Sequence, residues 1–391
     1  MTFDALWSQL ADVGRARSGG YRRFAWTPVD ATLREWFAAT ARGLGLDVVR
    51  DRAGNLWAWW GSPDAEGPGI AVGSHLDSVP DGGAYDGPLG VVSALAAVSA
   101  LRSRGYLPAR PVGVVCFADE EGARFGIACA GSRLLTGALD ADRARGLRDE
   151  HGTTMAEALA AAGVEPRHVG RDDEALRRVG VFVELHVEQG RGLVQRGAAV
   201  GVGSAIWPHG RWRLDLPGRA DHAGTTALID RLDPMLDLAR LITGAREAAH
   251  RHGALATVGK VRVQPGGVNA VPSHVTAWLD ARAPAEAAVR AVLADLGDLP
   301  APVEESWTPR TPFDASLGAE VCALLGGVPV LETGAGHDAG VLATAGVPTS
   351  MLFVRNPTGV SHSPHEHADR EDCLAGVDAL IHVVEHLAGA R

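Results

Sequence analysis

Four short apolar runs in this chain lead directly into residues that carry carboxylates or imidazoles. The runs are 69–73 (GIAVG), 112–117 (VGVVCF), 181–187 (VFVELHV) and 350–354 (SMLFV). They alternate with stretches of helical periodicity, at 2–17, 30–44 (with Asp30 as the expected N-cap), 88–103 and 155–162. Buried strands that alternate with helices are typical of a mostly parallel sheet. The sequence therefore predicts an α/β domain.

The middle of the chain has a different pattern. Segments 211–217, 255–263 and 274–282 alternate polar and apolar residues, as strands with one solvent-exposed face do. Two helical stretches, 230–250 and 284–297, accompany them. We therefore expect a smaller α+β domain at 209–316, inserted between the two parts of the α/β domain at 1–208 and 317–391.

In α/β sheets, ligands bind beyond the carboxyl ends of the strands. The residues delivered to or near these ends here are His75, Asp77, Asp86, Glu120, Glu121, Glu184, His186 and His362. One carboxylate after a strand is usually a helix cap or a solvated turn. Four such endings together favour a metal site, because imidazole and carboxylate groups suit zinc or manganese. The residues alone therefore favour a metal-dependent hydrolase.

Two local arrangements add to this interpretation. Asp77 follows His75 by two residues, so its carboxylate is placed to accept the second ring N–H and fix the tautomer. Glu120 and Glu121 are adjacent, and neighbouring side chains in an extended segment point apart. One of the two glutamates can then bind a metal while the other stays free as a base.

Composition excludes several classes of protein. The net charge is 37 − 47 = −10, and an acidic surface disfavours nucleic acid as a partner. No run of about 18 apolar residues predicts a membrane span, and the first twenty residues lack the apolar block of a signal peptide. The four cysteines form no short-spaced pair, and Cys116 lies in an apolar run. These features predict a soluble cytoplasmic protein without a disulfide framework.

Six segments resemble the signatures of a known group of enzymes, the N-carbamoyl-L-amino-acid hydrolases and allantoate amidohydrolases. This group belongs to the di-metal aminoacylase and carboxypeptidase-like superfamily. The segments are GSHLDSVPDGGAYDGPLGV, FADEEGARFG, ELHVEQG, DHAGTT, GAGHDA and GVSHSPHE, in the expected order from about residue 55 onward. The resemblance implies a catalytic domain split in two by an inserted dimerisation, or lid, domain.

The resemblance implies two divalent metal ions per subunit, zinc or manganese. The implied ligands are Asp86 as a bridge, His75 and His186 for one ion, and Glu121 and His362 for the other. Glu120 is implied as the general base. Peptidases of the superfamily usually carry an acidic ligand in place of His186, so this histidine favours the carbamoyl and ureido branch.

The resemblance also implies substrate contacts. They are His222 as a donor to the oxyanion, Arg282 for the substrate carboxylate, Asn269 beside it, Gln189 for the carbamoyl or ureido amide, and the backbone of Gly336. From the residues alone, Arg282 is interpreted as a surface ion-pair partner of Asp280, and Gln189 as a turn residue. The roles of His337 and Asp338 stay open. Arg355 is expected either to touch an acidic substrate group or to face solvent, and His365 and His367 are expected to be loop residues.

The implied reaction is hydrolysis of a terminal ureido group on a small carboxylate, with release of ammonia and carbon dioxide. Allantoate and N-carbamoyl-L-amino acids are the two substrate types. A homodimer joined through the inserted domain is implied, in which His222, Asn269 and Arg282 reach a neighbour's metal centre. One alternative is an aminoacylase or dipeptidase acting on N-acyl amides, which His186 and Gln189 disfavour. Another is a non-catalytic, metal-stabilised binding protein, which the pair Glu120 and Glu121 disfavours.

Overall fold

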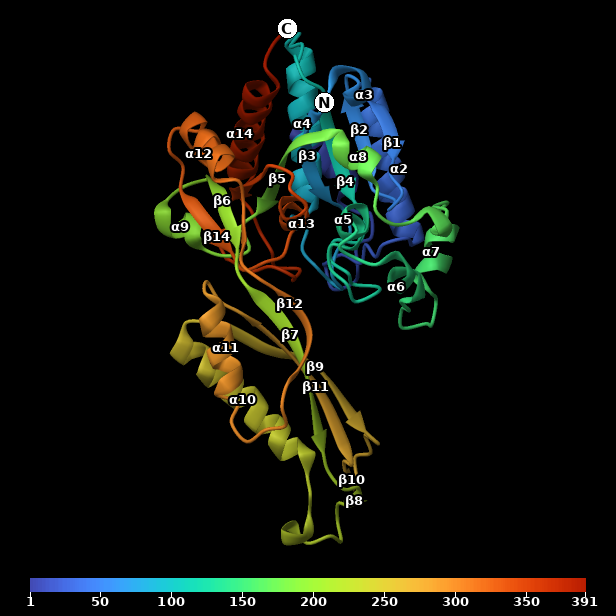
Figure 1. The fold of residues 1–391 in the computed structure, drawn as a ribbon, viewed down its shortest axis with the longest axis vertical. Coiled ribbons are helices and arrows are strands. Elements are labelled where there is room, and N and C mark those ends of the chain that lie inside the picture. Colours follow the sequence, from blue (N-terminus) through green and yellow to red (C-terminus); the bar gives the residue numbers. More distant parts are fainter. The chain divides into compact units, whose positions relative to one another are not determined.

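The computed structural model describes residues 1–391 (Figure 1). The chain divides into two compact units. One contains Met1–Ser204 and Pro312–Arg391, and the other, the inserted unit, is Ala205–Thr311. The expected domain boundaries, after 208 and after 316, lie a few residues beyond these positions. None of the helices combines the length and the apolar content that a membrane crossing requires.

The larger unit is built on a nine-stranded sheet in the order β1-β2-β4-β3-β5-β15-β6-β13, with β14 paired beside β6. The strands are β1 Asp47–Arg50, β2 Leu56–Trp60, β3 Gly69–His75, β4 Val112–Phe117, β5 Val179–Val187, β6 Val200–Ile206, β13 Thr311–Pro312, β14 Val330–Thr333 and β15 Thr349–Val354. The central strands β4, β3, β5 and β15 are parallel. Strands β1, β2 and β6 pair antiparallel at the flanks. The predicted α/β class with a mostly parallel sheet is confirmed.

Helices cover both faces of this sheet (Figure 1). They are α1 Phe3–Leu10, α2 Pro28–Gly43, α3 Pro63–Glu66, α4 Pro88–Ser103, α5 Ala130–Thr136, α6 Ala141–Gly146, α7 Met155–Ala161, α8 Asp173–Arg177, α9 Gly192–Arg196, α12 Ala315–Leu324, α13 Asp338–Thr344 and α14 Arg370–Ala388. Helices α1, α2, α4 and α14 share one apolar core with the sheet, to which Leu185 and Val187 of β5 contribute. Helix α13 packs on β5, β15 and α5. Because side chains alternate along a strand, Glu184 and His186 point away from the core that Leu185 and Val187 enter.

Two expected helix boundaries are wrong. The N-cap of α2 is Thr27, whose hydroxyl accepts the Asp30 backbone N–H, and Pro28 occupies the first turn. The Asp30 carboxylate instead accepts the Trp26 backbone N–H. Helix α1 ends at Leu10 rather than continuing to residue 17, because the chain turns at Gly14 with a φ of +75°. Glycine tolerates this left-handed conformation without strain.

The inserted unit has a four-stranded antiparallel sheet in the order β12-β7-β11-β9 and a two-stranded ribbon, β8-β10. Its elements are β7 His209–Pro217, β8 Asp221–His222, α10 Pro234–His252, β9 Leu255–Gln264, β10 Ala270–Val271, β11 His274–Arg282, α11 Glu286–Ala294 and β12 Val303–Thr308. Leu214, Val275 and Leu279 lie on one face of the sheet, in a shared core with Leu238 and Leu241 of α10. The predicted polar–apolar alternation therefore corresponds to one covered face.

Candidate metal centre

The carboxylate of Asp86 faces two different groups of side chains. Its Oδ1 lies 3.1 Å from His186 Nε2 and 3.6 Å from His75 Nε2. Its Oδ2 lies 3.4 Å from His362 Nε2, and that nitrogen is also 3.4 Å from Glu121 Oε2. Within each group the potential ligand atoms lie within 4.8 Å of one another. A carboxylate with one oxygen toward each group has the arrangement of a bridging ligand.

The ends of the parallel strands position the first of these groups. His75 is the last residue of β3, and His186 is the second-last residue of β5. Asp86 reaches them from the loop before α4, where Gly87 has a φ of +83°. A Cβ atom at Gly87 would come within 2.4 Å of His75 Cε1. Glycine is therefore required for the loop to approach the histidine this closely.

The two histidines of this centre present ligand atoms that fit a cation. His75 Nδ1 is 3.1 Å from the carbonyl oxygen of Asp77, and His186 Nδ1 is 2.8 Å from that of Val187. A carbonyl only accepts, so in the neutral rings Nδ1 carries the proton and Nε2 presents a lone pair. Both Nε2 atoms are buried without a hydrogen-bond partner. They face the Asp86 carboxylate, so three acceptors converge on one point, and these residues fit a divalent metal ion.

The electrostatics of the group also call for positive charge. Burial lowers the pKa of His75, but the nearby carboxylates of Glu120, Asp77 and Asp86 outweigh burial and hold this pKa well above its ordinary value. Burial raises the pKa of Asp86, yet contacts with His186 and His75 bring it well below the usual range. The folded site thus favours cationic charge beside ionised carboxylate.

Asp77 acts differently from the expectation. Its carboxylate accepts the backbone N–H groups of Glu120 at 3.2 Å and Glu121 at 3.0 Å, and lies 3.5 Å from His75 Nδ1. The shorter contact with the ring comes from its own carbonyl oxygen. The side chain of Asp77 therefore mainly fixes the loop that carries the two glutamates.

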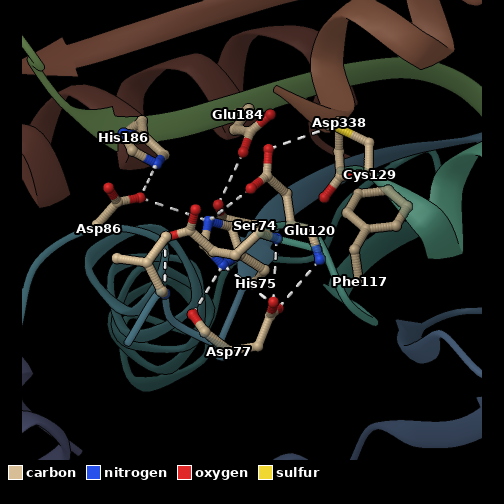
Figure 2. Close-up of polar contacts among 12 residues, drawn as sticks. Ser74, His75, Asp77, Asp86, Phe117, Glu120, Cys129, Glu184, His186 and Asp338 are labelled. Atoms are coloured by element: carbon tan, nitrogen blue, oxygen red, sulfur yellow. Dashed lines mark hydrogen bonds and ion pairs between the residues drawn. The ribbon is translucent and has the colours of Figure 1, made fainter. Parts of the chain in front are cut away.

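The side chains of Glu120 and Glu121 contact different residues. Figure 2 shows the contacts of Glu120. Glu120 Oε2 is 3.7 Å from His75 Nε2, and its Oε1 accepts the Cys129 thiol at 3.3 Å. Glu121 contacts His362 and accepts the Val79 backbone N–H at 3.4 Å. Burial raises the pKa of Glu120, His75 lowers it, and the net value lies well above the ordinary range. A carboxylate with a raised pKa beside the cluster is suited to exchange protons.

Gln189 lies against the bridging position. Its Nε2 donates to Asp86 Oδ2 at 2.8 Å and to Ser361 Oγ at 3.2 Å. Its Oε1 is buried and has no hydrogen-bond partner. Gln189 is thus more than a turn residue, and it presents a buried acceptor that lacks a donor.

Comparison with known proteins identifies the family of this chain. Residues 71–386 match the model of peptidase family M20/M25/M40. The chain belongs to this family. An N-carbamoyl-L-amino acid amidohydrolase of Geobacillus stearothermophilus is 37% identical, with 98% of both chains covered. An allantoate amidohydrolase of Escherichia coli strain K12 is 31% identical, over 97% of this chain and 96% of the relative.

The chain is also similar to a solved structure of a related amidase. An amidase of the hydantoinase/carbamoylase family from Burkholderia vietnamiensis has a TM-score of 0.90 and 30% identity, over 99% of this chain and 97% of that one. The resemblance seen in the six sequence segments is therefore confirmed. As a member of family M20/M25/M40, the protein is a hydrolase.

One residue that supports the centre of this M20-family member could not be recognised from the sequence. Glu366 lies between the two histidines considered as loop residues, and it is buried. Its Oε1 accepts the backbone N–H groups of Tyr85 at 2.8 Å and Asp86 at 2.9 Å. Burial raises the pKa of Glu366 to about 7. This carboxylate fixes the backbone of the loop that carries Asp86.

Buried groups around His186 account for several residues whose roles were open. The ring of His337 packs edge-on against that of His186, with centroids 4.5 Å apart. Glu184 accepts Ser74 Oγ at 2.7 Å and the Ala339 backbone N–H at 2.9 Å (Figure 2). Asp338 accepts the Ser132 hydroxyl. These contacts brace β5 against α13 and α5 behind the centre.

Two residues of the inserted unit lie side by side. The β8–β10 pairing places His222 opposite Ala270, and the Ala223 backbone N–H donates to the Asn269 carbonyl at 2.9 Å. His222 Nδ1 accepts the Gly224 backbone N–H at 3.0 Å. The proton of the neutral ring is therefore on Nε2, which makes the exposed His222 a hydrogen-bond donor.

Arg282 lies far from that pair within the unit. It ends β11, whereas the ribbon joins the opposite end, where His274 pairs with Pro217. Eight strand steps of about 3.4 Å separate the two ends of β11 by about 27 Å. Arg282 donates to both carboxylate oxygens of Asp280, at 2.7 and 3.0 Å, so the ion pair considered from the sequence is present.

The other residues considered from the sequence lie outside the two groups around Asp86. Arg355 donates to both carboxylate oxygens of Asp372, at 2.7 and 2.8 Å, and its side chain stays partly exposed to solvent. His365 and His367 are exposed and belong to neither potential ligand group. Gly336 lies in the loop before α13 with open space at its Cα.

Proposed function

We propose that this protein hydrolyses the ureido or carbamoyl group of a small carboxylate, either allantoate or an N-carbamoyl-L-amino acid, and releases ammonia and carbon dioxide. The observation that carries the proposal is the Asp86 carboxylate, which presents one oxygen to each of two potential ligand groups. Relatives that span nearly the whole chain are named for these two substrates, which supports the choice of bond.

In this proposal Asp86 would be a ligand of two divalent cations, zinc or manganese, which His75 and His186 on one side and Glu121 and His362 on the other would help to hold. When bound, such a pair polarises the substrate carbonyl and lowers the pKa of the attacking water. The remaining steps belong to side chains of the protein. The proton that water loses as it attacks the carbonyl carbon needs an acceptor nearby.

Glu120 is the proposed acceptor of that proton. Its carboxylate lies next to His75 but outside both potential ligand groups, so it is free to act as a base. It takes a proton from the attacking water and returns it to the nitrogen that leaves.

The unpartnered Oε1 of Gln189 supports a ureido substrate over an N-acyl amide. A buried acceptor without a donor costs about 1–3 kcal/mol, so it favours a ligand that brings an N–H group. The terminal NH2 of a carbamoyl or ureido group supplies such a donor. The acyl group of an N-acyl amino acid carries a methyl or methylene at the same place.

The inserted unit supplies the other proposed contacts. His222 donates from Nε2 to the oxyanion that develops on the carbonyl, a role that the Gly224 contact supports by fixing the tautomer. Asn269 and the Gly336 backbone hydrogen-bond the substrate. Arg282 binds the carboxylate of the substrate, because a planar guanidinium can donate two hydrogen bonds to it. In doing so, the Arg282 side chain leaves its ion pair with Asp280.

We propose that a homodimer joined through the inserted unit brings these residues together. One small substrate cannot touch His222, Asn269 and Arg282 of one chain, because the first two lie about 27 Å along the sheet from the third. It can touch Arg282 of one chain together with His222 and Asn269 of another. Strand β9 supports this arrangement, since it is an edge strand and exposes Leu255. Helix α10 of the same unit exposes Leu236.

An ammonia-release screen tests the proposed function. The purified protein, loaded with zinc or with manganese, is assayed with allantoate, a set of N-carbamoyl-L-amino acids, N-acetyl amino acids and dipeptides. We expect ammonia from at least one ureido acid. Turnover confined to N-acyl amides or dipeptides would indicate the aminoacylase or dipeptidase alternative. Tight metal binding without any turnover would indicate a binding protein.

A further inference from the structure

Cys129 makes a direct contact with the proposed base. Its Sγ lies 3.3 Å from Glu120 Oε1, and this is the only hydrogen bond that the Glu120 carboxylate makes within the protein (Figure 2). Both side chains are buried. A thiol with an ordinary pKa near 8.5 is protonated at neutral pH, so Cys129 is the donor and the carboxylate is the acceptor.

The backbone holds this thiol in place. Cys129 precedes α5 and has a φ of +55°, a left-handed conformation that a residue with a side chain rarely adopts. Its backbone N–H donates to the carbonyl of Glu120 at 2.6 Å, and the next two residues, Ala130 and Gly131, donate to Asp119 and Ala118 at 2.9 Å each. Three consecutive backbone hydrogen bonds thus join the segment of Cys129 to the segment of Glu120.

The contact distinguishes the two oxygens of Glu120. Oε1 is held by the thiol, while Oε2 is the atom near His75 Nε2 and the Asp86 group. The thiol is the hydrogen-bond donor to Oε1, and it adds to the His75 contact at Oε2 in setting the terminal torsion of the carboxylate, which is otherwise broad and soft. Proton transfer requires the oxygen within hydrogen-bond reach of the reacting atom, so orientation of this carboxylate affects the rate.

We propose that Cys129 is a positioning residue that orients the Glu120 carboxylate for proton transfer. The inference rests on the proposed function, because it assumes that Glu120 is the base. It adds a side chain that neither the sequence segments nor the two potential ligand groups include. Cys129 acts through Glu120 and has no contact with the substrate in this proposal.

Kinetics of cysteine variants test the proposal. In Cys129→Ala we expect kcat to fall about tenfold with KM within about twofold, since one hydrogen bond to a charged group is lost. Cys129→Ser, whose hydroxyl replaces the donor, should recover most of kcat. Cys116→Ala is the matched control, because it removes a buried thiol from β4 that does not contact Glu120. Equal kcat in Cys129→Ala and Cys116→Ala, or no recovery in Cys129→Ser, would overturn the proposal.

A second measurement separates this inference from the proposed function. The S–H stretching band of Cys129 is isolated by subtracting the infrared spectrum of Cys129→Ser from that of the unmodified protein, without any turnover. We expect this band to shift when Glu120 is replaced by Ala, because the carboxylate acceptor is lost. An unchanged band would disprove the contact even in an active enzyme. A different outcome would concern the base. If the Cys129 band shifted in Glu120→Ala but Glu120→Gln kept full turnover, the contact would stand and the role of Glu120 as base would be disproved.

Discussion

The carboxylate of Glu366 accepts the backbone N–H of Asp86 at 2.9 Å, across a separation of 280 residues in the chain. The same oxygen accepts the Tyr85 backbone N–H, so one buried side chain fixes two successive peptide groups. The position of the proposed bridging ligand therefore depends on a residue in a different loop, which follows β15.

Glu366→Ala should weaken metal retention. It leaves two buried backbone donors near Asp86 without an acceptor, and loss of such a supporting contact typically costs about 10–100-fold in metal affinity. Metal content after dialysis against a graded series of chelator concentrations measures this. Glu371→Ala, an exposed position on α14, is the control. Identical retention curves for the two variants would show that the Asp86 loop holds its position alone.

Glu120→Gln should abolish turnover while metal stays bound. The amide cannot take a proton from water, and general-base catalysis typically contributes about 10²–10⁴-fold, so kcat should fall by at least about 100-fold. Metal content by atomic emission is measured on the same sample. A variant that has lost both metal and activity would place Glu120 among the ligands instead.

Arg282→Ala should mainly weaken substrate binding. Loss of a buried charge partner costs about 2–5 kcal/mol, so KM should rise strongly. Arg211→Ala is a close control, since Arg211 also approaches Asp280, at 3.4 Å, from the neighbouring strand β7. Steady-state kinetics of both variants decide the assignment. If KM rose equally in both, the effect would come from Asp280 and not from a contact between Arg282 and the substrate.

Asp51 should make stability depend on pH. Burial raises its pKa to about 6, although hydrogen bonds from Trp57 and Asn55 lower it. Because this folded-state pKa lies above the ordinary 3.8, the contribution of Asp51 is fully present below about pH 4 and is lost as the pH rises through 6. A rise of about two pKa units corresponds to about 3 kcal/mol.

Urea unfolding of the unmodified protein and Asp51→Asn, at a series of pH values from 4 to 7, measures this contribution. Relative to the variant, the unmodified protein should lose up to about 3 kcal/mol of unfolding free energy over that range. A difference between the two proteins that does not change with pH would mean that Asp51 has an ordinary pKa in the folded state.

The sequence predicted the parts of the fold and of the candidate site that depend on local order. Four buried strands were recognisable because each is a short apolar run, and parallel strands bring their carboxyl ends to one edge of a sheet. His75 and His186 could therefore be named together from the sequence. The resemblance to known segments added Asp86, Glu121 and His362 as a set.

Residues that act through contacts distant in the sequence could not be predicted. Glu366 supports Asp86 from 280 residues away, and its neighbours His365 and His367 gave the more conspicuous signal. Cys129 reaches Glu120 with its own backbone in a left-handed conformation, which cysteine does not usually adopt. The separation of Arg282 from His222 depends on strand pairing, which local periodicity leaves undetermined.

The hydrogen bonds at the two buried histidines have a consequence for how this centre tolerates mutation. His75 and His186 each direct Nδ1 to a main-chain carbonyl, at positions 77 and 187. Every amino acid carries that oxygen, so a substitution at either position leaves the acceptor in place. The tautomer of each ring is therefore set by a backbone oxygen and not by the side chain at position 77 or 187. The side chain of Val187 packs in the core of the sheet, so a substitution there would test packing while the acceptor for His186 stays in place.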